Sequence, residues 1–529
     1  MKSTRKVFFL LTIFLSNVFA SDNAALVHTL EALPKKEVGK ELYNKYCATC
    51  HHKKRIGLDG PPLLPKFLRK FTEKELSSKI KDGFPQTLMP KYDFLNPYEL
   101  LSIARYIKSP IKEKIQWSKE DIYNSITSFD DPLNPLKIKD IEQVLPVVER
   151  DGSKVWVMED TRVLSKFPLA NVHGGIKYSS DAKNIYVPTR DGWVQNYSLK
   201  TGQRFNKVRA CINLRNISLS NDGKNLFATC LLPEQVVIID TKSMIPLEVK
   251  KLEGKVSALY ELYSQDKAIF TFRNKPLLAT LDTNSFKINY TNIDDPIEDF
   301  FIDPFEDYLI GTARKGKLLR VFDLKTLKMV FEYKMEGMPH LFSATYWYKN
   351  GNFYFATPHI KKPYVTIWKM YDWQFIKQVN IKGDGFFVKT HPNTPYLWTD
   401  NGSDKLVLID KEDYSLKTLT PRKNKQYIHT EYSGDGKYTY LSIYEKDGEI
   451  IVLDTNSFKQ LASYKANIPV GKYNYINKSR KFYPRLFGWD IFKQKCKNTL
   501  PCENLKLNTY EKRSLEAFLQ SIKRKSIYK

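Results

Sequence analysis

Histidine and methionine are scarce in this sequence, because its 529 residues contain eight of each. Acidic residues are also outnumbered: 58 Asp and Glu stand against 84 Lys and Arg and leave a formal net charge of +26. The basic excess is mostly lysine spread over every segment, without an RNA-recognition or zinc-finger pattern, so we expect no nucleic-acid partner. With 42% hydrophobic and 13% aromatic residues, the composition excludes a mainly disordered chain.

Long apolar runs are lacking too, apart from one at the N-terminus. Basic residues precede the apolar stretch 7–15 and small residues end at Ala20, which is the pattern of a secretory signal peptide over residues 1–20. An uncleaved anchor is the alternative, but the run is shorter than the ~20 residues that a spanning helix needs. We therefore expect a periplasmic protein that has no membrane span after signal cleavage.

Two of the six cysteines lie in the sequence Cys47-Ala48-Thr49-Cys50-His51, the C-x-x-C-H pattern of covalent haem c attachment. The two thiols bond the vinyl groups of the haem, and the adjacent imidazole becomes an iron ligand. A redox-active cysteine pair or half of a zinc site is the alternative. The first usually begins a helix of a βαβ unit, and the second requires another ligand pair that this region lacks.

The second iron ligand of this haem is predicted by elimination. After Met1, Met89 is the only methionine before residue 158, and Pro90 follows it. A thioether ligand would raise the haem potential into a range useful for electron transfer. A methionine that only packs in the core is the alternative. Helical patterns on both sides of the haem motif predict an all-α cytochrome c domain over residues 36–113.

Beyond a predicted linker, residues 114–140, the pattern changes to short runs of β-branched and aromatic residues between polar turns. Similar turns begin at Ser180, Asn221, Gln265, Pro304, Lys349, Pro392 and Gly434. A repeat of ~40–45 residues with two hairpin turns is typical of a four-stranded propeller blade, whereas a β-solenoid would repeat sooner. We therefore predict an all-β eight-bladed β-propeller over residues 141–483.

Five of the eight histidines lie in the predicted propeller, and each is close to a repeat boundary. They are His173, His340, His359, His391 and His429. A single histidine of this kind is more often a hydrogen-bonded structural residue. Five at similar blade positions indicate a shared pocket at the axis of the propeller.

A haem c motif followed by such a propeller resembles the cytochrome cd1 family, whose propeller holds a d1 haem. The matching pieces are residues 60–65, 89–90, 173–175, 190–193, 209–216, 338–340, 356–359, 383–391, 432–433 and 471–474. Residues 190–193 (Arg-Asp-Gly-Trp) and 471–474 (Gly-Lys-Tyr-Asn) look most like the family branch that dehydrogenates dihydro-haem d1, rather than the nitrite reductases.

The resemblance implies that the d1 macrocycle lies non-covalently in the mouth of the propeller. Its candidate iron ligands are His173, His340 and Tyr473, and the sequence does not order them. The candidate partners of its carboxylates are Arg190, Arg209 and Arg215, because a planar guanidinium donates two parallel hydrogen bonds. Surface arginines without a ligand are the alternative for each.

Catalytic roles also come from the resemblance alone. His359 and His391 resemble the pair that donates protons to nitrite in the reductases, and His429 looks like a pocket residue that accepts a proton. The implied reaction oxidises a propionate of dihydro-haem d1 to an acrylate, the last step of d1 haem biosynthesis, and haem c passes the electrons on. A cytochrome cd1 nitrite reductase, which forms nitric oxide, and a non-enzymatic d1 haem carrier or insertion factor are the alternatives.

Partners and the C-terminal segment complete the expectations. The resemblance implies a periplasmic electron acceptor or donor, and contacts with cytochrome cd1 nitrite reductase and other d1 haem maturation proteins. It ends near residue 483, and the extension 484–529 has a helical pattern over residues 511–522 that we expect to pack on the propeller or a neighbouring subunit. In an oxidising compartment, Cys496 and Cys502 could form a local disulfide, with free thiols as the alternative, while Cys211 and Cys230 are either paired or buried.

Overall fold

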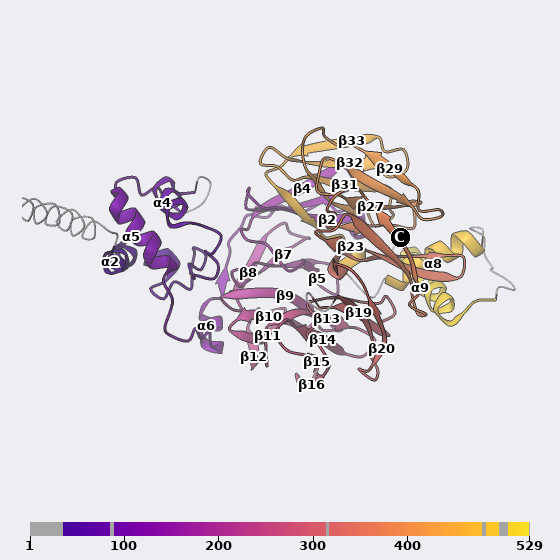
Figure 1. Cartoon of the computed structure of the whole chain (residues 1–529), viewed down its shortest axis with the longest axis horizontal. Helices are drawn as coiled ribbons and strands as arrows, with labels where there is room; N and C mark the ends of the chain where they lie inside the picture. The colour runs from indigo at the N-terminus through magenta and orange to yellow at the C-terminus, as the bar shows by residue number, and fades with distance from the viewer. Residues whose placement is uncertain (1–34, 85–88, 314–316, 479–482, 497–505, 528–529) are drawn as a thin grey trace, which may run out of the picture. The chain divides into compact units, whose positions relative to one another are not determined.

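The computed structural model describes residues 35–84, 89–313, 317–478, 483–496 and 506–527 (Figure 1). The predicted signal peptide, residues 1–20, lies outside these residues. The chain divides after Ile115 into two compact units. In the described ranges, no helix is both long and apolar enough to cross a membrane.

The first unit is helical, as the sequence predicts. Its helices are α2 (Lys36–Tyr46), α3 (Ala48–His51), α4 (Glu73–Asp82) and α5 (Pro97–Lys108). Helices α2 and α5 cross closely at Gly39, where an added Cβ would lie 2.0 Å from the Ser102 carbonyl oxygen. Capping boxes at Thr72 and Asn96 satisfy the first N–H groups of α4 and α5, so the sequence itself defines where both helices begin.

The predicted linker is partly built into the second unit. Helix α6 (Lys119–Asn124) packs beside the propeller, and strand β1 (Thr127–Ser128) pairs with β8 as an additional outer strand. Three residues further on, Arg204 grips both carboxylate oxygens of Asp131, with its Nε at 2.8 Å and its Nη2 at 2.7 Å. These contacts fasten the segment to one blade of the second unit.

Eight sheets form the predicted eight-bladed propeller. From the inner to the outer strand, blade 1 consists of β34 (Pro469–Lys472), β2 (Val144–Glu149), β3 (Lys154–Glu159) and β4 (Arg162–Pro168). Blade 2 consists of β5 (Lys177–Tyr178), β6 (Asn184–Pro188), β7 (Trp193–Ser198), β8 (Arg204–Arg209) and β1. Blade 3 consists of β9 (Asn213–Leu219), β10 (Asn225–Leu232), β11 (Glu234–Asp240) and β12 (Pro246–Lys251). Blade 4 consists of β13 (Val256–Leu262), β14 (Lys267–Phe272), β15 (Leu277–Asp282) and β16 (Ile288–Asn292). Blade 5 consists of β17 (Asp299–Ile302), β18 (Tyr308–Thr312), β19 (Leu318–Asp323) and β20 (Met329–Lys334).

The remaining three blades complete the ring. Blade 6 consists of β21 (Met338–Pro339), β23 (Asn352–Ile360), β24 (Tyr364–Lys369) and β25 (Phe375–Asn380), with β22 (Thr345–Lys349) also paired to β23. Blade 7 consists of β26 (Val388–Lys389), β27 (Tyr396–Asp400), β28 (Leu406–Asp410) and β29 (Leu416–Leu419). Blade 8 consists of β30 (Tyr427–Tyr432), β31 (Tyr438–Ile443), β32 (Glu449–Asp454) and β33 (Gln460–Lys465). Because β34 is the inner strand of blade 1, the end of the propeller sequence pairs with its beginning and closes the ring.

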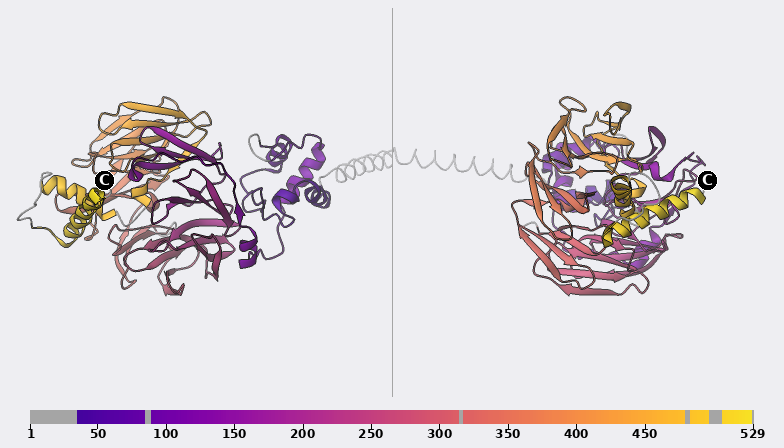
Figure 2. Two further views of the ribbon diagram at one scale, coloured as in Figure 1. Left: turned by 180° about the vertical axis from the view of Figure 1, so that it is seen from behind. Right: turned by 90° about the vertical axis from the view of Figure 1, so that its right-hand side faces the viewer.

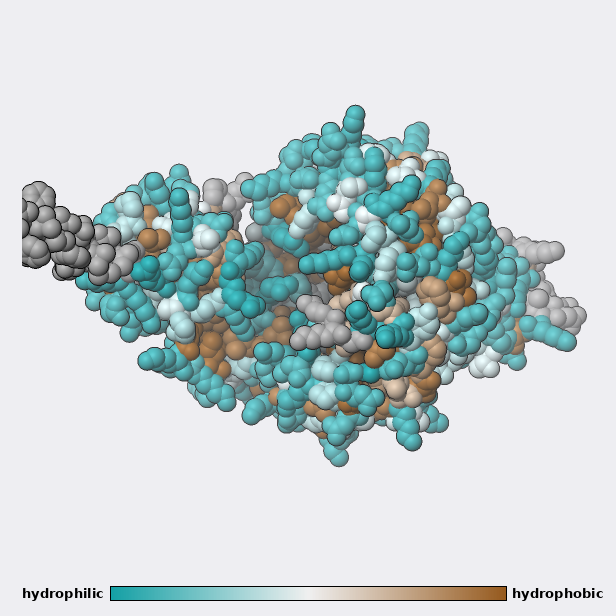
Figure 3. Space-filling view, viewed as in Figure 1, coloured by the Kyte–Doolittle hydropathy of each residue, from teal (hydrophilic) through white to brown (hydrophobic). Residues whose placement is uncertain are grey.

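One of the two recurring turns of the repeat has a clear physical cause. Between the third and fourth strands, an aspartate side chain accepts a hydrogen bond from the N–H three residues later, as Asp282 does from Ser285 at 2.7 Å. Asp240, Asp323 and Asp454 repeat this turn in other blades. The period seen in the sequence is therefore a period of side-chain-capped hairpins. Hydrophilic residues dominate the face drawn in Figure 3, as the lysine-rich composition predicts.

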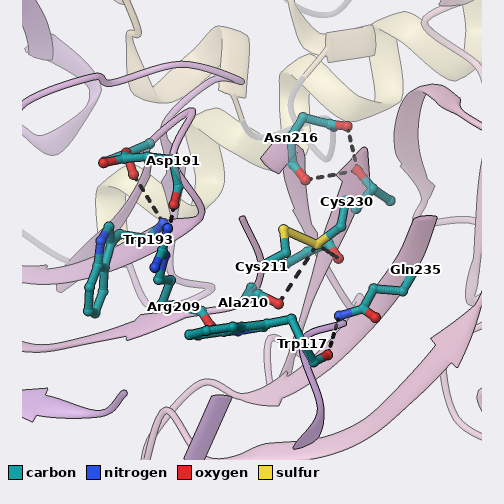
Figure 4. Close-up of a disulfide and its surroundings, with 12 residues drawn as sticks. Trp117, Asp191, Trp193, Arg209, Ala210, Cys211, Asn216, Cys230 and Gln235 are labelled. Carbon is teal, nitrogen blue, oxygen red and sulfur yellow. Dashed lines mark hydrogen bonds between the residues drawn. A yellow bond between two sulfur atoms is a disulfide. The ribbon is translucent and has the colours of Figure 1, made fainter. Parts of the chain in front are cut away.

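Cys211 and Cys230 form a disulfide in blade 3, which decides between the two alternatives left by the sequence (Figure 4). Both sulfur-bearing residues are fully buried in the core of that blade. Cys496 is also disulfide-bonded, whereas Cys502 lies outside the described residues.

The C-terminal extension packs on the propeller. After α7 (Tyr475–Lys478), it forms α8 (Tyr483–Lys495), which the sequence pattern did not indicate, and α9 (Thr509–Ile527), which contains the predicted helix. Phe487 of α8 lies among Phe305 and Phe353 of blades 5 and 6, with ring centroids 5.9 and 4.9 Å away. Both helices lie over one end of the ring in the two views of Figure 2.

Candidate functional site

The haem motif lies where α2 ends and α3 begins. Cys47 and Cys50 are free thiols, the first buried and the second exposed, and burial raises the pKa of the Cys47 thiol to about 12. The His51 ring is held by a 2.8 Å hydrogen bond from Nδ1 to the Pro61 carbonyl oxygen. With its proton on Nδ1, the imidazole presents the Nε2 lone pair, the arrangement that a metal-ligating histidine needs.

The surroundings fit a covalent haem c. Gly60 lies against the imidazole so closely that an added Cβ would be 2.6 Å from His51 Cε1, so a larger residue would displace the ring. Tyr43 donates hydrogen bonds to the carbonyl oxygens of His51 and His52, at 3.2 and 2.8 Å. Met89 packs against the same hydrophobic core as Cys47. Its role as the second iron ligand stays a prediction.

A second site lies at one end of the propeller. The inner strands of the blades run in one direction, so their N-terminal ends gather at the same end, together with the C-terminal ends of the second strands. We call this end the N-terminal mouth. It contains Arg150, His173, Arg190, Arg215, Arg273, His340, Asp400, His429 and Tyr473.

Four arginines make the N-terminal mouth strongly positive. Partial loss of water inside the mouth, followed by repulsion from Arg150 and Arg273, lowers the pKa of Arg190, although part of its side chain remains exposed. Burial, followed by repulsion from Arg273, lowers the pKa of Arg215 to about 10. Among the described residues, Arg150, Arg190 and Arg215 form no ion pair with a carboxylate. A cluster of this kind, in which these three arginines have no paired carboxylate, is suited to a ligand that carries several carboxylates.

His173 borders this cluster. Burial, followed by repulsion from Arg190 and Arg215, lowers its pKa to about 3, so the imidazole is neutral. Within the described chain its Nδ1 atom is buried and has no hydrogen-bond partner. An unsatisfied nitrogen is available to a ligand or a metal.

His340 is oriented by a carboxylate. Its Nδ1 lies 2.8 Å from Oδ2 of Asp299, and its ring packs on Phe386 with centroids 4.3 Å apart. A histidine whose Nδ1–H is held by a carboxylate presents Nε2 as a strong metal ligand. His340 is thus one of the residues that would hold the iron of a bound macrocycle.

His429 lies in β30, the inner strand of blade 8, at the same mouth. Its ring contacts Phe387 at a centroid distance of 4.7 Å, and its buried Nδ1 has no partner in the part of the chain that is described. Burial, then the ammonium groups of Lys472 and Lys389, lower its pKa well below the usual value. The imidazole is therefore neutral, and the same burial and positive charges oppose its protonation.

Tyr473 follows β34 and folds back toward the mouth. An added Cβ at Gly471 would be 2.5 Å from its hydroxyl, and one at Gly175 would be 3.9 Å from its Cε1 atom. Burial raises the pKa of the phenol to about 12, although Arg150 opposes this shift. The hydroxyl thus keeps its proton at neutral pH.

The structure does not bring His391 to the mouth. His391 follows the inner strand of blade 7, and its Nε2 lies 3.3 Å from the carbonyl oxygen of Gly434, beyond the end of β30. Its ring contacts Trp489 of α8. Positions 429 and 434 are five steps apart, which corresponds to roughly 16 Å along an extended strand. The expectation of a pocket shared by five histidines is therefore wrong for His391.

Two more candidates are engaged inside the protein. His359 is fully buried, with Nδ1 3.2 Å from the Glu336 carbonyl oxygen and Nε2 3.0 Å from Thr366 Oγ1, and burial lowers its pKa to about 4. Arg209 is 1% exposed and donates from Nε to the Asp191 carbonyl oxygen at 3.0 Å (Figure 4). Both have the contacts of structural residues.

Sequence reasoning missed Arg150 and Arg273. Both follow the end of a second strand within one residue, in blades 1 and 4, and Arg190 takes a similar place in blade 2. A position-by-position alignment of the repeats would have grouped these three arginines, because equivalent blade positions lie at the same end of the propeller.

Taken together, the fold and the two sites define a c-type cytochrome joined to a propeller that binds a tetrapyrrole. The chain belongs to the cytochrome d1 haem domain family, since the model "Cytochrome D1 heme domain" matches residues 139–478. The helical unit matches the model "Cytochrome C oxidase, cbb3-type, subunit III" over residues 34–107.

Individual relatives narrow this class. The chain is 30% identical over 467 residues to Dihydro-heme d1 dehydrogenase of Pseudomonas aeruginosa, covering 83% of this chain and 94% of that protein. It is 28% identical to Protein NirF of the same organism over 360 residues, which cover 61% and 89% of the two chains. A solved structure of Dihydro-heme d1 dehydrogenase NirN in complex with DHE superposes with a TM-score of 0.79 at 30% identity, covering 83% of this chain and 99% of the other.

Proposed function

We propose that this chain is an oxidoreductase that converts dihydro-haem d1 into d1 haem, in the last step of d1 haem biosynthesis. The observation that carries the proposal is the N-terminal mouth, which combines a neutral His429 with arginines that form no ion pair among the described residues. The 30% identity to Dihydro-heme d1 dehydrogenase over most of both chains supports it.

Binding is the first task of the mouth. Arg150, Arg190 and Arg215 would hold the carboxylates of the macrocycle, because guanidinium groups pair with them through two parallel hydrogen bonds. His173, His340 and Tyr473 are the candidate iron ligands. We favour His340 among them, because Asp299 already fixes its Nδ1 at 2.8 Å.

Oxidation of the propionate to an acrylate breaks one C–H bond on each of two adjacent carbons and forms a C=C bond. Two protons and two electrons leave. His429 is placed to accept a proton, because its Nδ1 has no partner in the described residues, and the carboxylates of a bound macrocycle would offset the lysine charges that lower its pKa. When bound at Cys47, Cys50 and His51, with Met89 as the proposed second ligand, haem c supplies one-electron transfer to an external acceptor.

The nitrite reductase alternative requires two histidines at the iron that can protonate nitrite. His359 has both ring nitrogens bonded inside the protein, and His391 lies near the opposite end of the propeller. This arrangement favours dehydrogenation over nitrite reduction.

We propose the periplasm as the location, in line with the signal sequence predicted over residues 1–20. The proposed partners are a periplasmic electron acceptor, other d1 haem maturation proteins, and a cytochrome cd1 nitrite reductase that receives the product. The lysine-rich surface would suit an acidic redox partner.

The test is a turnover assay on the full chain carrying haem c. The protein is incubated without oxygen with dihydro-haem d1 and an artificial electron acceptor, and the extracted tetrapyrrole is analysed by mass spectrometry. We expect a product that has lost two hydrogens, formed repeatedly and without nitrite. Binding without conversion would make the protein a carrier, and sustained formation of nitric oxide from nitrite would make it a reductase.

A further inference from the structure

His429 has an unusual backbone for a strand residue. Its φ is 55°, and it is the one non-glycine residue with a positive φ inside a strand of the described chain. The pairing of β30 with β31 shifts register between Ile428 and Glu431, so His429 lies in a β-bulge. Residues other than glycine rarely adopt this conformation, and they keep it only where the surroundings hold it.

Lys472 holds the carbonyl side of this bulge. The lysine is 1% exposed, and it reaches from β34 of blade 1 to donate hydrogen bonds from Nζ to the His429 carbonyl oxygen and, at 2.6 Å, to Ser442 Oγ. A buried ammonium group needs hydrogen-bond acceptors. The His429 carbonyl oxygen and Ser442 Oγ therefore hold the ammonium group in place, and the ammonium group in turn holds the His429 carbonyl.

Asp400 holds the other side from blade 7. Its Oδ1 accepts hydrogen bonds from the N–H groups of Phe386 and Phe387, at 2.5 and 3.3 Å, and its Oδ2 lies 3.5 Å from the His429 nitrogen. The Phe387 ring in turn packs on the imidazole. Asp400 therefore acts on His429 in two ways. It positions the Phe387 ring that packs on the imidazole, and it accepts a weaker hydrogen bond from the His429 backbone N–H.

We propose that Lys472 and Asp400 are positioning residues that together hold His429 in its left-handed conformation and aim its imidazole into the N-terminal mouth. The inference rests on the proposed function, since it assumes that His429 is the proton acceptor. The two residues act from the blades on either side of blade 8. Neither needs to touch the substrate, so their loss should change the rate of conversion rather than the binding of the macrocycle.

The test compares Lys472→Met with wild type in the holoprotein. Methionine keeps the length and apolar stem of lysine but cannot donate to the His429 carbonyl oxygen. We expect kcat to fall about tenfold to a hundredfold, while the Kd for dihydro-haem d1 and the absorption spectrum of the bound macrocycle stay within about twofold. Lys472→Arg retains a cationic donor and should recover part of the lost kcat.

Lys411→Met is the matched control. Lys411 is also a buried lysine, and its Nζ donates to a histidine carbonyl oxygen, that of His391, at 3.3 Å. It lies near the opposite end of the propeller, so its replacement should leave kcat unchanged. A similar fall of kcat in both variants would mean general damage and would overturn the proposal.

Other outcomes separate this inference from the function on which it rests. If wild type converts dihydro-haem d1 and Lys472→Met converts it equally fast, the positioning role is refuted and the function stands. If wild type does not convert it, the proposed function fails first. Should Lys472→Met not fold, Asp400→Ala replaces it, because alanine removes the acceptors for Phe386, Phe387 and the His429 N–H together. A lower kcat with unchanged Kd supports the proposal, and an unchanged kcat overturns it.

Discussion

Replacing Arg190 by glutamine should weaken the binding of dihydro-haem d1 and leave the fold intact. Arg190 is exposed at the N-terminal mouth and, among the described residues, forms no ion pair with a carboxylate. Arg150 and Arg273 repel its charge. Removing a charge from a cluster of like charges breaks no favourable ion pair, so the free energy of unfolding should stay the same or rise slightly.

The size of the binding effect follows from the chemistry of one guanidinium–carboxylate pair. A hydrogen bond to a charged group contributes about 1.5–3 kcal/mol, and solvent at an exposed arginine places Arg190 at the lower end. About 1.5 kcal/mol corresponds to a tenfold rise in Kd. Arg190→Lys keeps the charge without the paired donors, so it should lie between wild type and Arg190→Gln.

The assay is an absorbance titration of the haem c holoprotein with dihydro-haem d1 at low and high salt, because screening should reduce the difference between the variants. Arg209→Gln is the contrasting variant. Arg209 is buried between the rings of Trp117 and Trp193, so its loss should lower the free energy of unfolding by about 2–4 kcal/mol. If Arg190→Gln binds the macrocycle as tightly as wild type at both salt concentrations, this arginine is not a carboxylate ligand.

Three further predictions concern the framework of the propeller. Phe487→Ala should cost about 3–5 kcal/mol, seen as a lower thermal midpoint, because the ring is 2% exposed, and an unchanged midpoint would mean that α8 does not stabilise the propeller. Replacing both Cys211 and Cys230 by alanine removes a cross-link between residues 19 positions apart, and the free energy of unfolding in denaturant should fall by about 3 kcal/mol. An unchanged free energy of unfolding would mean that the disulfide does not constrain the unfolded chain. His359 has a folded pKa of about 4 against 6.5 when unfolded, so stability should be lost as pH falls from 6.5 to 4, by up to about 3 kcal/mol, and His359→Asn should lose less.

Features that depend on near neighbours in the sequence were predictable. The C-x-x-C-H motif needs only adjacent residues, and the repeated turns are made by side chains that bond a backbone N–H two or three positions away. The helical unit and the eight blades therefore followed from spacing. Helix α8 did not, because its buried Phe487 and Ile491 face blades 5 and 6, which are far away in the sequence.

Which end of the propeller a residue occupies was harder to predict. His391 and His429 both lie near inner strands, yet His391 follows its strand and His429 lies near the beginning of its own. Inner strands here are as short as two residues, so an error of a few positions in a boundary moves a side chain to the opposite end. Arg190 and Arg209 differ in the same way: one follows the second strand of its blade and the other ends the fourth.

The bulge at His429 shows why the direction of its side chain could not be predicted from the sequence pattern. Ile428 pairs with Ser442 and Glu431 pairs with Tyr440, so three steps on β30 stand opposite two on β31. One additional residue reverses the alternation of side chains beyond it, and a regular strand would therefore place Glu431 on the wrong face. In the structure Glu431 is buried and lies 3.7 Å from Lys389, an ion pair beneath the mouth. The local break in the strand thus places both the imidazole at the mouth and the charges below it, and it depends on Lys472 and Asp400 from neighbouring blades.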